Sequence, residues 1–233
     1  MKANTIDLRS APNPACKKCD RKDRDELTDD GLCRVAPSVY DGLPVRCVGE
    51  WAYEKIFHLH QYLGIFARGM RKKWARLNYI EICAGPGRCI LKERGEEVDG
   101  TALAVIHHPD FSWISSALFI DNNPEAVAVL TERIRRAGHG GKARAIMGDY
   151  TDPAGIVQAI KALPTGRLTL VLIDPTDCSI PFDTVAGIIN GLGAVDLIIN
   201  LPIYMDAGRN LLKAAAHPKK YMRAREKYTR FLG

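Results

Sequence analysis

Residues 78–95, NYIEICAGPGRCILKERG, are the stretch that decides the fold. Their apolar run carries one acidic residue, Glu81, and then turns through Gly85, Pro86 and Gly87. A buried strand that runs into a glycine turn is typical of the ligand-binding edge of an α/β sheet. The segments after this turn indicate whether such a sheet is present.

Short β-branched runs recur after this stretch and alternate with helical patterns. We predict strands at 79–83, 117–121, 143–147, 168–173 and 195–200, and helices near 124–137, 153–163 and 181–192. Asn123 and Pro124 are typical of the start of a helix. Strands that are apolar throughout indicate burial on both faces. The sequence therefore predicts an α/β protein with a Rossmann-like doubly wound parallel sheet.

Two regions flank the predicted sheet. Residues 50–76 have an amphipathic pattern and should form a leading helix, while residues 206–233 form a basic helical tail. Residues 1–49 are rich in loops and contain four of the seven cysteines, so we interpret them as a small appended Cys-rich module. The expected organisation is this module at 1–49 and a Rossmann-like domain at 50–233.

Length and composition restrict the class of protein. With 233 residues, 46% of them hydrophobic, the chain can bury one substantial core. No run approaches the roughly 18 consecutive apolar residues of a membrane span, and the N-terminus has no apolar stretch of signal-peptide length. We therefore expect a soluble, cytoplasmic protein with reduced cysteines and no membrane partner.

The formal net charge of +6 is concentrated at the C-terminal end. From position 213 onward Glu226 is the one acidic residue, against Lys213, Lys219, Lys220, Arg223, Arg225, Lys227 and Arg230. A basic cluster of this kind suits contact with nucleic acid or an acidic partner, and an ordinary solvated helix face is the alternative.

Carboxylates occur at the ends of several predicted strands. Glu81 lies in the first strand, and Asp121, Asp149 and Asp174 lie at or just beyond the ends of three others. Because the carboxyl ends of parallel strands meet at one edge, where such sheets bind ligands, these side chains should gather there. This clustering is the main functional signal in the sequence.

The glycine loop argues against a dinucleotide. A pyrophosphate site needs a Gly-x-Gly-x-x-Gly run whose N–H groups and following helix hold the phosphates. Here Pro86 has no N–H, and Cys89 or Ile90 stands where a later glycine belongs. S-adenosylmethionine (SAM) has no phosphate and needs close backbone approach and acidic partners. We predict that Asp121 meets its ribose and Asp149 its adenine, in a cofactor site of Glu81, Ala84, Gly85, Gly87, Asp121, Asn122, Asp149 and Asp174.

Five motifs, EICAGPGR, FIDNNP, GDY, IDPTDCSIPF and IINLP, occur in this order. In this combination residues 47–210 resemble the three-Cys-motif partner protein family, whose fold is like that of class I SAM-dependent methyltransferases. The resemblance implies a Cys-motif partner protein. It also implies roles for residues of this chain: a first cofactor motif at Glu81, Gly85 and Gly87, a ribose acid at Asp121, and a catalytic face at Asp174 and Pro175.

Two features depart from a general class I methyltransferase. Cys83 stands at the first glycine position of the cofactor loop, where it should crowd the methionine end of SAM unless the turn shifts. Glu81 and Asp121 are 40 residues apart, whereas a minimal βαβ unit needs roughly 20. Residues 91–116 should therefore hold an insertion or a longer crossover.

The predicted catalytic residues are Asp174, Pro175, Thr176 and Asp177. Enzymes that methylate base amino groups commonly have Asp/Asn-Pro-Pro-aromatic here, with the ring stacked on a flipped base. The aromatic residue is missing from this motif, and Phe182 or Tyr204 is a candidate replacement. Cys178 is a candidate nucleophile, but a neighbouring Asp177 should raise the pKa of its thiol, which favours a packed thiol instead.

The N-terminal cysteines have spacing that suits a metal. Cys16 and Cys19 form a Cys-x₂-Cys pair, and Cys33 and Cys47 come later in the same segment. Four thiolates are what a tetrahedral structural zinc site requires, and a short Cys-rich segment has little apolar material with which to fold otherwise. We predict zinc, with free thiols or redox chemistry as alternatives.

These observations together predict a SAM-dependent methyltransferase that acts on nucleic acid. The alternative is a non-catalytic or partner-dependent binding protein that keeps the methyltransferase fold. After Asn200 a complete class I fold has two more strands, whereas residues 201–233 have a helical pattern. We therefore expect a fragment or a shortened member of the fold.

Overall fold

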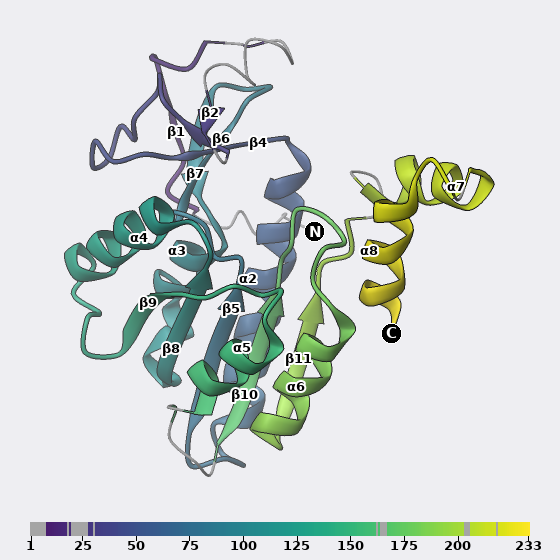
Figure 1. Cartoon of the computed structure of the whole chain (residues 1–233). Helices are drawn as coiled ribbons and strands as arrows, with labels where there is room; N and C mark the ends of the chain where they lie inside the picture. The colour runs from purple at the N-terminus through teal and green to yellow at the C-terminus, as the bar shows by residue number, and fades with distance from the viewer. Residues whose placement is uncertain are drawn as a thin grey trace, which may run out of the picture.

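The computed structural model describes residues 8–17, 19, 28–29, 31–161, 163, 167–202, 206–217 and 219–233. Tyr204, one of the two predicted aromatic replacements, lies outside these residues. Two sheets organise the described part of the chain (Figure 1). The larger one contains the five strands at whose ends the sequence predicts a ligand site.

This larger sheet has five parallel strands in the order β11-β10-β5-β8-β9. The strands are β5 (Leu77–Ile82), β8 (Ile114–Asp121), β9 (Ala143–Met147), β10 (Leu168–Ile173) and β11 (Val195–Ile199). The chain starts at the centre, moves out to one edge and returns to build the other, which is the doubly wound order. All five predicted strands are confirmed, with shifts of at most three residues at their ends.

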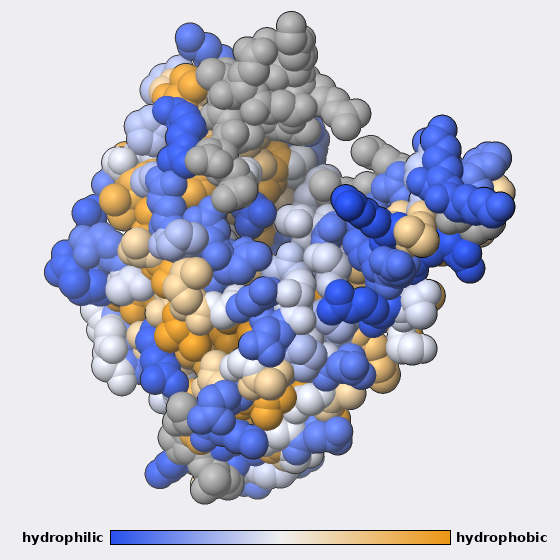
Figure 2. Space-filling view, in the orientation of Figure 1, coloured by the Kyte–Doolittle hydropathy of each residue, from blue (hydrophilic) through white to orange (hydrophobic). Residues whose placement is uncertain are grey.

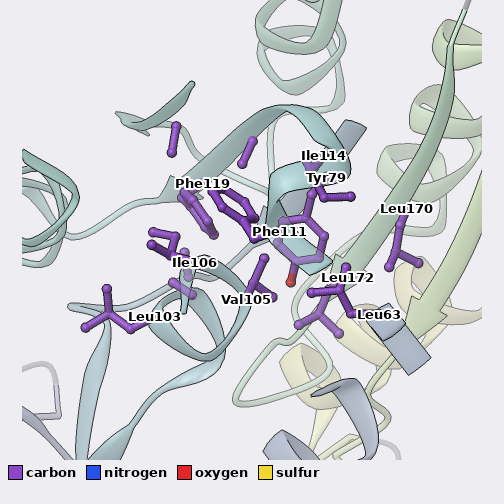
Figure 3. Close-up of a cluster of buried hydrophobic side chains, with 14 of the residues drawn as sticks. Leu63, Tyr79, Leu103, Val105, Ile106, Phe111, Ile114, Phe119, Leu170 and Leu172 are labelled. Atoms are coloured by element: carbon purple, nitrogen blue, oxygen red, sulfur yellow. The ribbon is translucent and has the colours of Figure 1, made fainter. Parts of the chain in front are cut away.

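Helices cover both faces of the sheet. On one face lie α2 (Trp51–Met70), α3 (Thr101–Ile106), the 3₁₀ helix η1 (Pro109–Trp113) and α4 (Pro124–Arg136); on the other lie α5 (Pro153–Lys161) and α6 (Phe182–Leu192). Figure 3 shows the core of the first face, where the rings of Tyr79 and Phe119 lie 5.8 Å apart. The Rossmann-like prediction is therefore confirmed.

The helix boundaries agree with the local signals in the sequence. Asn123 caps α4, because its side-chain oxygen accepts hydrogen bonds from the N–H groups of Glu125 and Ala126 at 2.9 and 3.1 Å. Gly138, just beyond the end of that helix, has a φ of +75°. The predicted leading helix forms as one unbroken element, α2.

The smaller sheet joins the N-terminal segment to a hairpin that comes directly after the glycine loop. Its order is β1-β7-β6-β4-β3-β2, and its strands are β1 (Ala11–Pro12), β2 (Thr28–Asp29), β3 (Leu32–Cys33), β4 (Arg46–Val48), β6 (Arg88–Leu91) and β7 (Glu96–Asp99). Strand β4 pairs in parallel with β6. The described N-terminal strands thus share their sheet with two strands from residues 88–99.

The hairpin leaves and re-enters the Rossmann-like domain at one point. The N–H of Gly100 donates to the carbonyl oxygen of Gly87 at 2.8 Å, and α3 then begins at Thr101. A Cβ added at Gly100 would lie 3.0 Å from that same oxygen, which is closer than an ordinary contact, so glycine suits this position. The insertion expected from the long spacing between Glu81 and Asp121 is therefore this hairpin, which begins slightly earlier than predicted.

A buried ion-pair network holds the hairpin to the N-terminal strands. Arg88 pairs with Glu97 and Asp99, all three being almost fully buried. Its guanidinium also donates to the carbonyl oxygen of Arg9 at 2.9 Å and lies 3.9 Å from the ring centre of Tyr40. The N-terminal segment is thereby fixed over the ligand-binding edge of the larger sheet (Figure 1).

The C-terminal residues form two helices that fold back on the same edge. They are α7 (Gly208–Ala216) and α8 (Met222–Leu232). Asp206, just before α7, accepts hydrogen bonds from Lys227 at 2.6 Å, from Tyr228 at 2.7 Å and from the N–H of Cys178 at 2.9 Å. Among the described helices, none has both the length and the apolar character needed to cross a membrane.

Candidate functional site

Asp121 connects the end of β8 to the glycine loop. One carboxylate oxygen accepts from the N–H of Gly85 at 2.7 Å, and the other accepts from the N–H of Asn123 at 2.9 Å. The Asp121 side chain is almost fully buried, whereas the neighbouring Asn122 is exposed. The structure therefore brings together two elements that the sequence predicted to share a ligand.

The loop itself has an unusual backbone conformation. Cys83, Gly85 and Gly87 have φ values of +68°, +62° and +94°. In this left-handed region a non-glycine residue costs about 1–3 kcal/mol, and such residues cluster at functional sites. The N–H groups of Cys83 and Ala84 both donate to the carbonyl oxygen of Ile120, at 2.9 and 3.1 Å. Cys83 thus adopts a glycine-like conformation, held by β8.

Gly87 has a packing role at the end of the loop. A Cβ added at Gly87 would lie 2.9 Å from the side chain of Leu130 on α4. The chain then continues directly into strand β6, and in this respect the loop differs from the phosphate-binding loops of other proteins. Helix α3 begins at Thr101, after the hairpin, so no helix continues directly from the loop as it does in a dinucleotide-binding turn.

Glu81 lies beneath the loop and is fully buried. It accepts a hydrogen bond from the hydroxyl of Tyr79 at 2.8 Å and another from the hydroxyl of Thr101. Burial raises its pKa to about 8, and the nearby Asp174 adds to this, while the two hydrogen bonds and Lys55 oppose it. Glu81 is therefore largely protonated at neutral pH and supports the site from below.

We expect the pKa of Glu81 to make stability depend on pH. Its carboxyl, ordinarily near 4.5, titrates near 8 in the folded chain, so its contribution is complete below about pH 4.5 and is lost as the pH rises through 8. Glu81→Gln, which stays neutral, should flatten the fall in melting temperature between pH 6 and pH 9. Exposed Glu226→Gln is the control. Equal slopes for all three proteins would contradict the assignment.

Asp174 lies at the end of β10 with partners from two other elements. It forms an ion pair with Lys55 on α2, and its second oxygen accepts from the side-chain amide of Asn200 at 2.8 Å. Asp174 is 9% exposed, and Pro175 beside it is buried. Asp174 therefore joins α2 to the end of β11 through these two contacts.

Thr176 and Asp177, the next two predicted catalytic residues, do not share the contacts of Asp174. Thr176 is exposed. Asp177 accepts from the N–H of Ser179 at 3.0 Å and lies 3.4 Å from the Lys227 ammonium, so it belongs to the contact between this loop and α8. Of the four predicted catalytic residues, Asp174 has the closest contact with cationic and amide groups from other elements.

An aromatic residue that the sequence interpretation missed lies near Asp174. The Lys55 ammonium, which pairs with Asp174, lies 5.0 Å from the ring centre of Trp51, and Trp51 is 44% exposed. Phe182, one of the two residues predicted to replace the missing aromatic, is the first residue of α6. It lies close to the C-terminal Gly233, since a Cβ added there would be 3.2 Å from the Phe182 ring. Lys55 and Trp51 share one face of α2, and the four-residue spacing between them was the available signal.

Asp149 lies just beyond the end of β9, next to β8 in the sheet. It is exposed and accepts from both the N–H and the hydroxyl of Thr151, at 2.8 and 2.7 Å. Gly148 before it packs closely, since an added Cβ would lie 2.5 Å from the Ile120 side chain. Asp149 therefore lies at the ligand edge on the β9 side of Asp121.

Cys178 is a packed thiol, as the sequence favoured. Burial raises its pKa to about 11, with Asp206 adding to the effect. Its side chain is 1% exposed. A buried thiol with a raised pKa is a poor nucleophile, so the covalent alternative has no support from this geometry.

The structure does not support the predicted zinc site. Cys16 and Cys33 pack against a small apolar cluster, the Cys19 thiol contacts the carbonyl oxygen of Lys17 at 3.0 Å, and Cys47 lies in β4. Burial, and then the neighbouring Cys33 and Cys19, raise the pKa of the Cys16 thiol. Within the described ranges no group of three or more His, Cys, Asp or Glu side chains is placed to hold a metal.

The chain was compared with protein families, curated proteins and solved structures. No protein family and no curated protein matches it, so the resemblance to the three-Cys-motif partner family has no support from these comparisons. Solved structures that are similar include a putative caffeoyl-CoA O-methyltransferase from Staphylococcus aureus (11% identity over 60% of this chain and 56% of the other, TM-score 0.38). A SAM-dependent methyltransferase from Clostridium acetobutylicum is 12% identical over 64% and 57% (TM-score 0.36).

A third similar structure is a putative SAM-dependent methyltransferase from Methanococcus maripaludis, 13% identical over 75% of this chain and 76% of the other, with a TM-score of 0.35. The chain thus spans little more than half the length of the first two proteins. TM-scores this low carry no argument. The fold assignment rests instead on the strand order and on the helices that cover both faces of the sheet.

Proposed function

We propose that this chain is a SAM-dependent methyltransferase. The observation that carries the proposal is the contact between the buried Asp121 carboxylate and the N–H of Gly85, in a loop that continues into a strand. A carboxylate beside a glycine loop suits an adenosyl ribose, while Pro86 in that loop has no N–H to donate to a pyrophosphate. Together these features fit a phosphate-free adenosyl ligand.

The residues of the edge have separate roles in this proposal. Asp121 would accept hydrogen bonds from the ribose, Asp149 would face the adenine, and Ala84 and Gly85 would allow close approach of the backbone. SAM supplies an activated methyl group on its sulfonium. Asp174, held in place by Lys55 and Asn200, would orient the substrate that receives the methyl group by accepting a hydrogen bond from it.

We assign nucleic acid as the acceptor class on two grounds. Lys213, Lys219, Lys220, Arg223, Arg225 and Arg230 are all exposed on or between α7 and α8, which are the strongly hydrophilic helices at the right of Figure 2. Trp51 offers an exposed ring near Asp174, where an unstacked base would need an aromatic partner. Basic helices and a stacking surface at one edge are what a single-stranded substrate requires.

Replacing these six exposed basic residues by glutamine should weaken binding of single-stranded RNA or DNA at least tenfold and reduce its salt dependence. Lys227 is retained because it anchors α8 to Asp206. Fluorescence anisotropy at several salt concentrations measures both effects. The control is Lys72→Gln with Lys73→Gln, exposed residues just after α2 at the opposite edge of the sheet. Unchanged affinity and slope would refute the role of the tail.

Two measurements test the methyltransferase proposal itself. Calorimetric titration with SAM and with S-adenosylhomocysteine (SAH) tests cofactor binding, and transfer of labelled methyl groups to total RNA, DNA or protein tests catalysis. We expect binding of both ligands and labelling of nucleic acid. SAH binding without labelling of any acceptor would favour the alternative, a partner-dependent protein that keeps the fold. Absence of binding would refute the proposal.

A further inference from the structure

A guanidinium from the N-terminal sheet lies over the glycine loop. Arg46 is the first residue of β4, and its backbone pairs with Leu32 of β3 and Cys89 of β6. A Cβ added at Gly85 would lie 3.4 Å from Nη1 of Arg46, and one added at Gly31 would lie 3.3 Å from its Nε. The side chain therefore spans from the N-terminal sheet to the residue whose N–H contacts Asp121.

Arg46 is half-buried and, among the residues that the structure describes, has no carboxylate partner. The acids of this edge are already engaged: Asp121 with two backbone N–H groups, Asp174 with Lys55 and Asn200, and Glu81 with two hydroxyls. By contrast, the buried guanidiniums of Arg88 and Arg133 both have acidic partners. A partly buried cation without a counter-ion is costly, and a bound anion would remove that cost.

The position of Arg46 indicates which anion it would meet. With ribose at Asp121 and adenine at Asp149, the amino-acid end of the cofactor lies on the other side of Gly85, towards Asp174 and Lys55. That end carries one carboxylate and one ammonium. Lys55, the other cation there, is already paired with Asp174. Among these cations, Arg46 is thus the one that is placed to meet the carboxylate of that end.

We propose that Arg46 binds the α-carboxylate of the cofactor, so that the N-terminal sheet completes the cofactor site. A guanidinium can hold a carboxylate through two parallel hydrogen bonds. The inference rests on the proposed function. It adds a residue, and an entire sheet, to a site that the sequence placed within residues 81–174.

The test compares SAH with 5′-methylthioadenosine, which keeps the adenosyl group but lacks the carboxylate and the ammonium. In calorimetric titrations of the full chain, wild type should prefer SAH. Arg46→Gln should lower the SAH affinity at least about tenfold, as expected for loss of a charged hydrogen bond, and leave the 5′-methylthioadenosine affinity unchanged. Arg46→Lys keeps the charge, so its affinity for SAH should lie between those of wild type and Arg46→Gln.

Arg94→Gln is the matched control, because Arg94 is an exposed arginine in the turn between β6 and β7 that pairs with Glu50. It should bind both ligands as wild type does. Equal losses of both ligands in Arg46→Gln would show a merely structural role and overturn the inference, as would unchanged SAH affinity. Wild-type protein that binds neither ligand would refute the proposed function and, with it, this inference.

Discussion

Asp121→Ala is expected to lower the affinity for SAH by about 100-fold or more. The variant removes the charged acceptor assigned to the ribose, a loss of about 1.5–3 kcal/mol, and it leaves the N–H groups of Gly85 and Asn123 without their acceptor. The second effect should loosen the loop that we propose approaches the cofactor. Calorimetric titration with SAH measures the loss directly.

The control for this experiment is Asp196→Ala. Asp196 lies near the start of β11, at the opposite edge of the same sheet, and accepts one hydrogen bond from the hydroxyl of Tyr62 at 2.7 Å. SAH affinity should stay at the wild-type value in this variant. A folded Asp121→Ala protein that binds SAH as tightly as wild type would remove the central support for the proposed function.

Arg88→Met is expected to lower the free energy of unfolding by about 3–5 kcal/mol. The change leaves Glu97 and Asp99 buried without their shared cation, and removal of one partner from a buried ion pair has a cost of this size. Ser38, the N–H of Val39 and His107 still contact these carboxylates. Chemical denaturation monitored by circular dichroism gives the free-energy difference.

Arg94→Met in the turn of the same hairpin is the matched control. Its pair with Glu50 is exposed, so the melting temperature and the denaturation midpoint should not change measurably. If Arg88→Met were as stable as wild type, the network could not be what holds the N-terminal strands to the hairpin.

The sheet was predictable because its signals are local. Apolar strands, the Asn123 cap and the strand-end acids each depend on residues close together in the sequence, and the structure confirms the strands and the cap. The contact between Asp121 and Gly85 agrees with the rule that parallel strands end at one edge. The alternation of Tyr79 and Glu81 on one face of β5 was a usable sign that the two side chains meet.

The groups that complete the site were not predictable in this way. Lys55 and Trp51 reach it because α2 packs across the sheet, and Arg46 reaches it because β4 pairs with β6. Both arrangements depend on contacts between distant segments. The hairpin at 88–99 has charged strands with no clear alternation, so its pairing with the N-terminal segment had no local signature. Cysteine spacing was equally insufficient, since it carries no information on where each thiol points.

The hydrogen bond between Gly87 and Gly100 has a consequence for the design of a minimal protein. Because the two ends of the hairpin meet there, residues 88–99 form a closed excursion whose removal would need only a short bridge between the two glycines. Its deletion would shorten the spacing between Glu81 and Asp121 from 40 to 28 residues, and it would remove no strand of the larger sheet. The same deletion would take away the two strands on which β1 and β4 are assembled. It would also uncover Ile56 of α2, which packs against Leu91 and Val98 of the hairpin, so the cover and the Rossmann-like scaffold share part of one core.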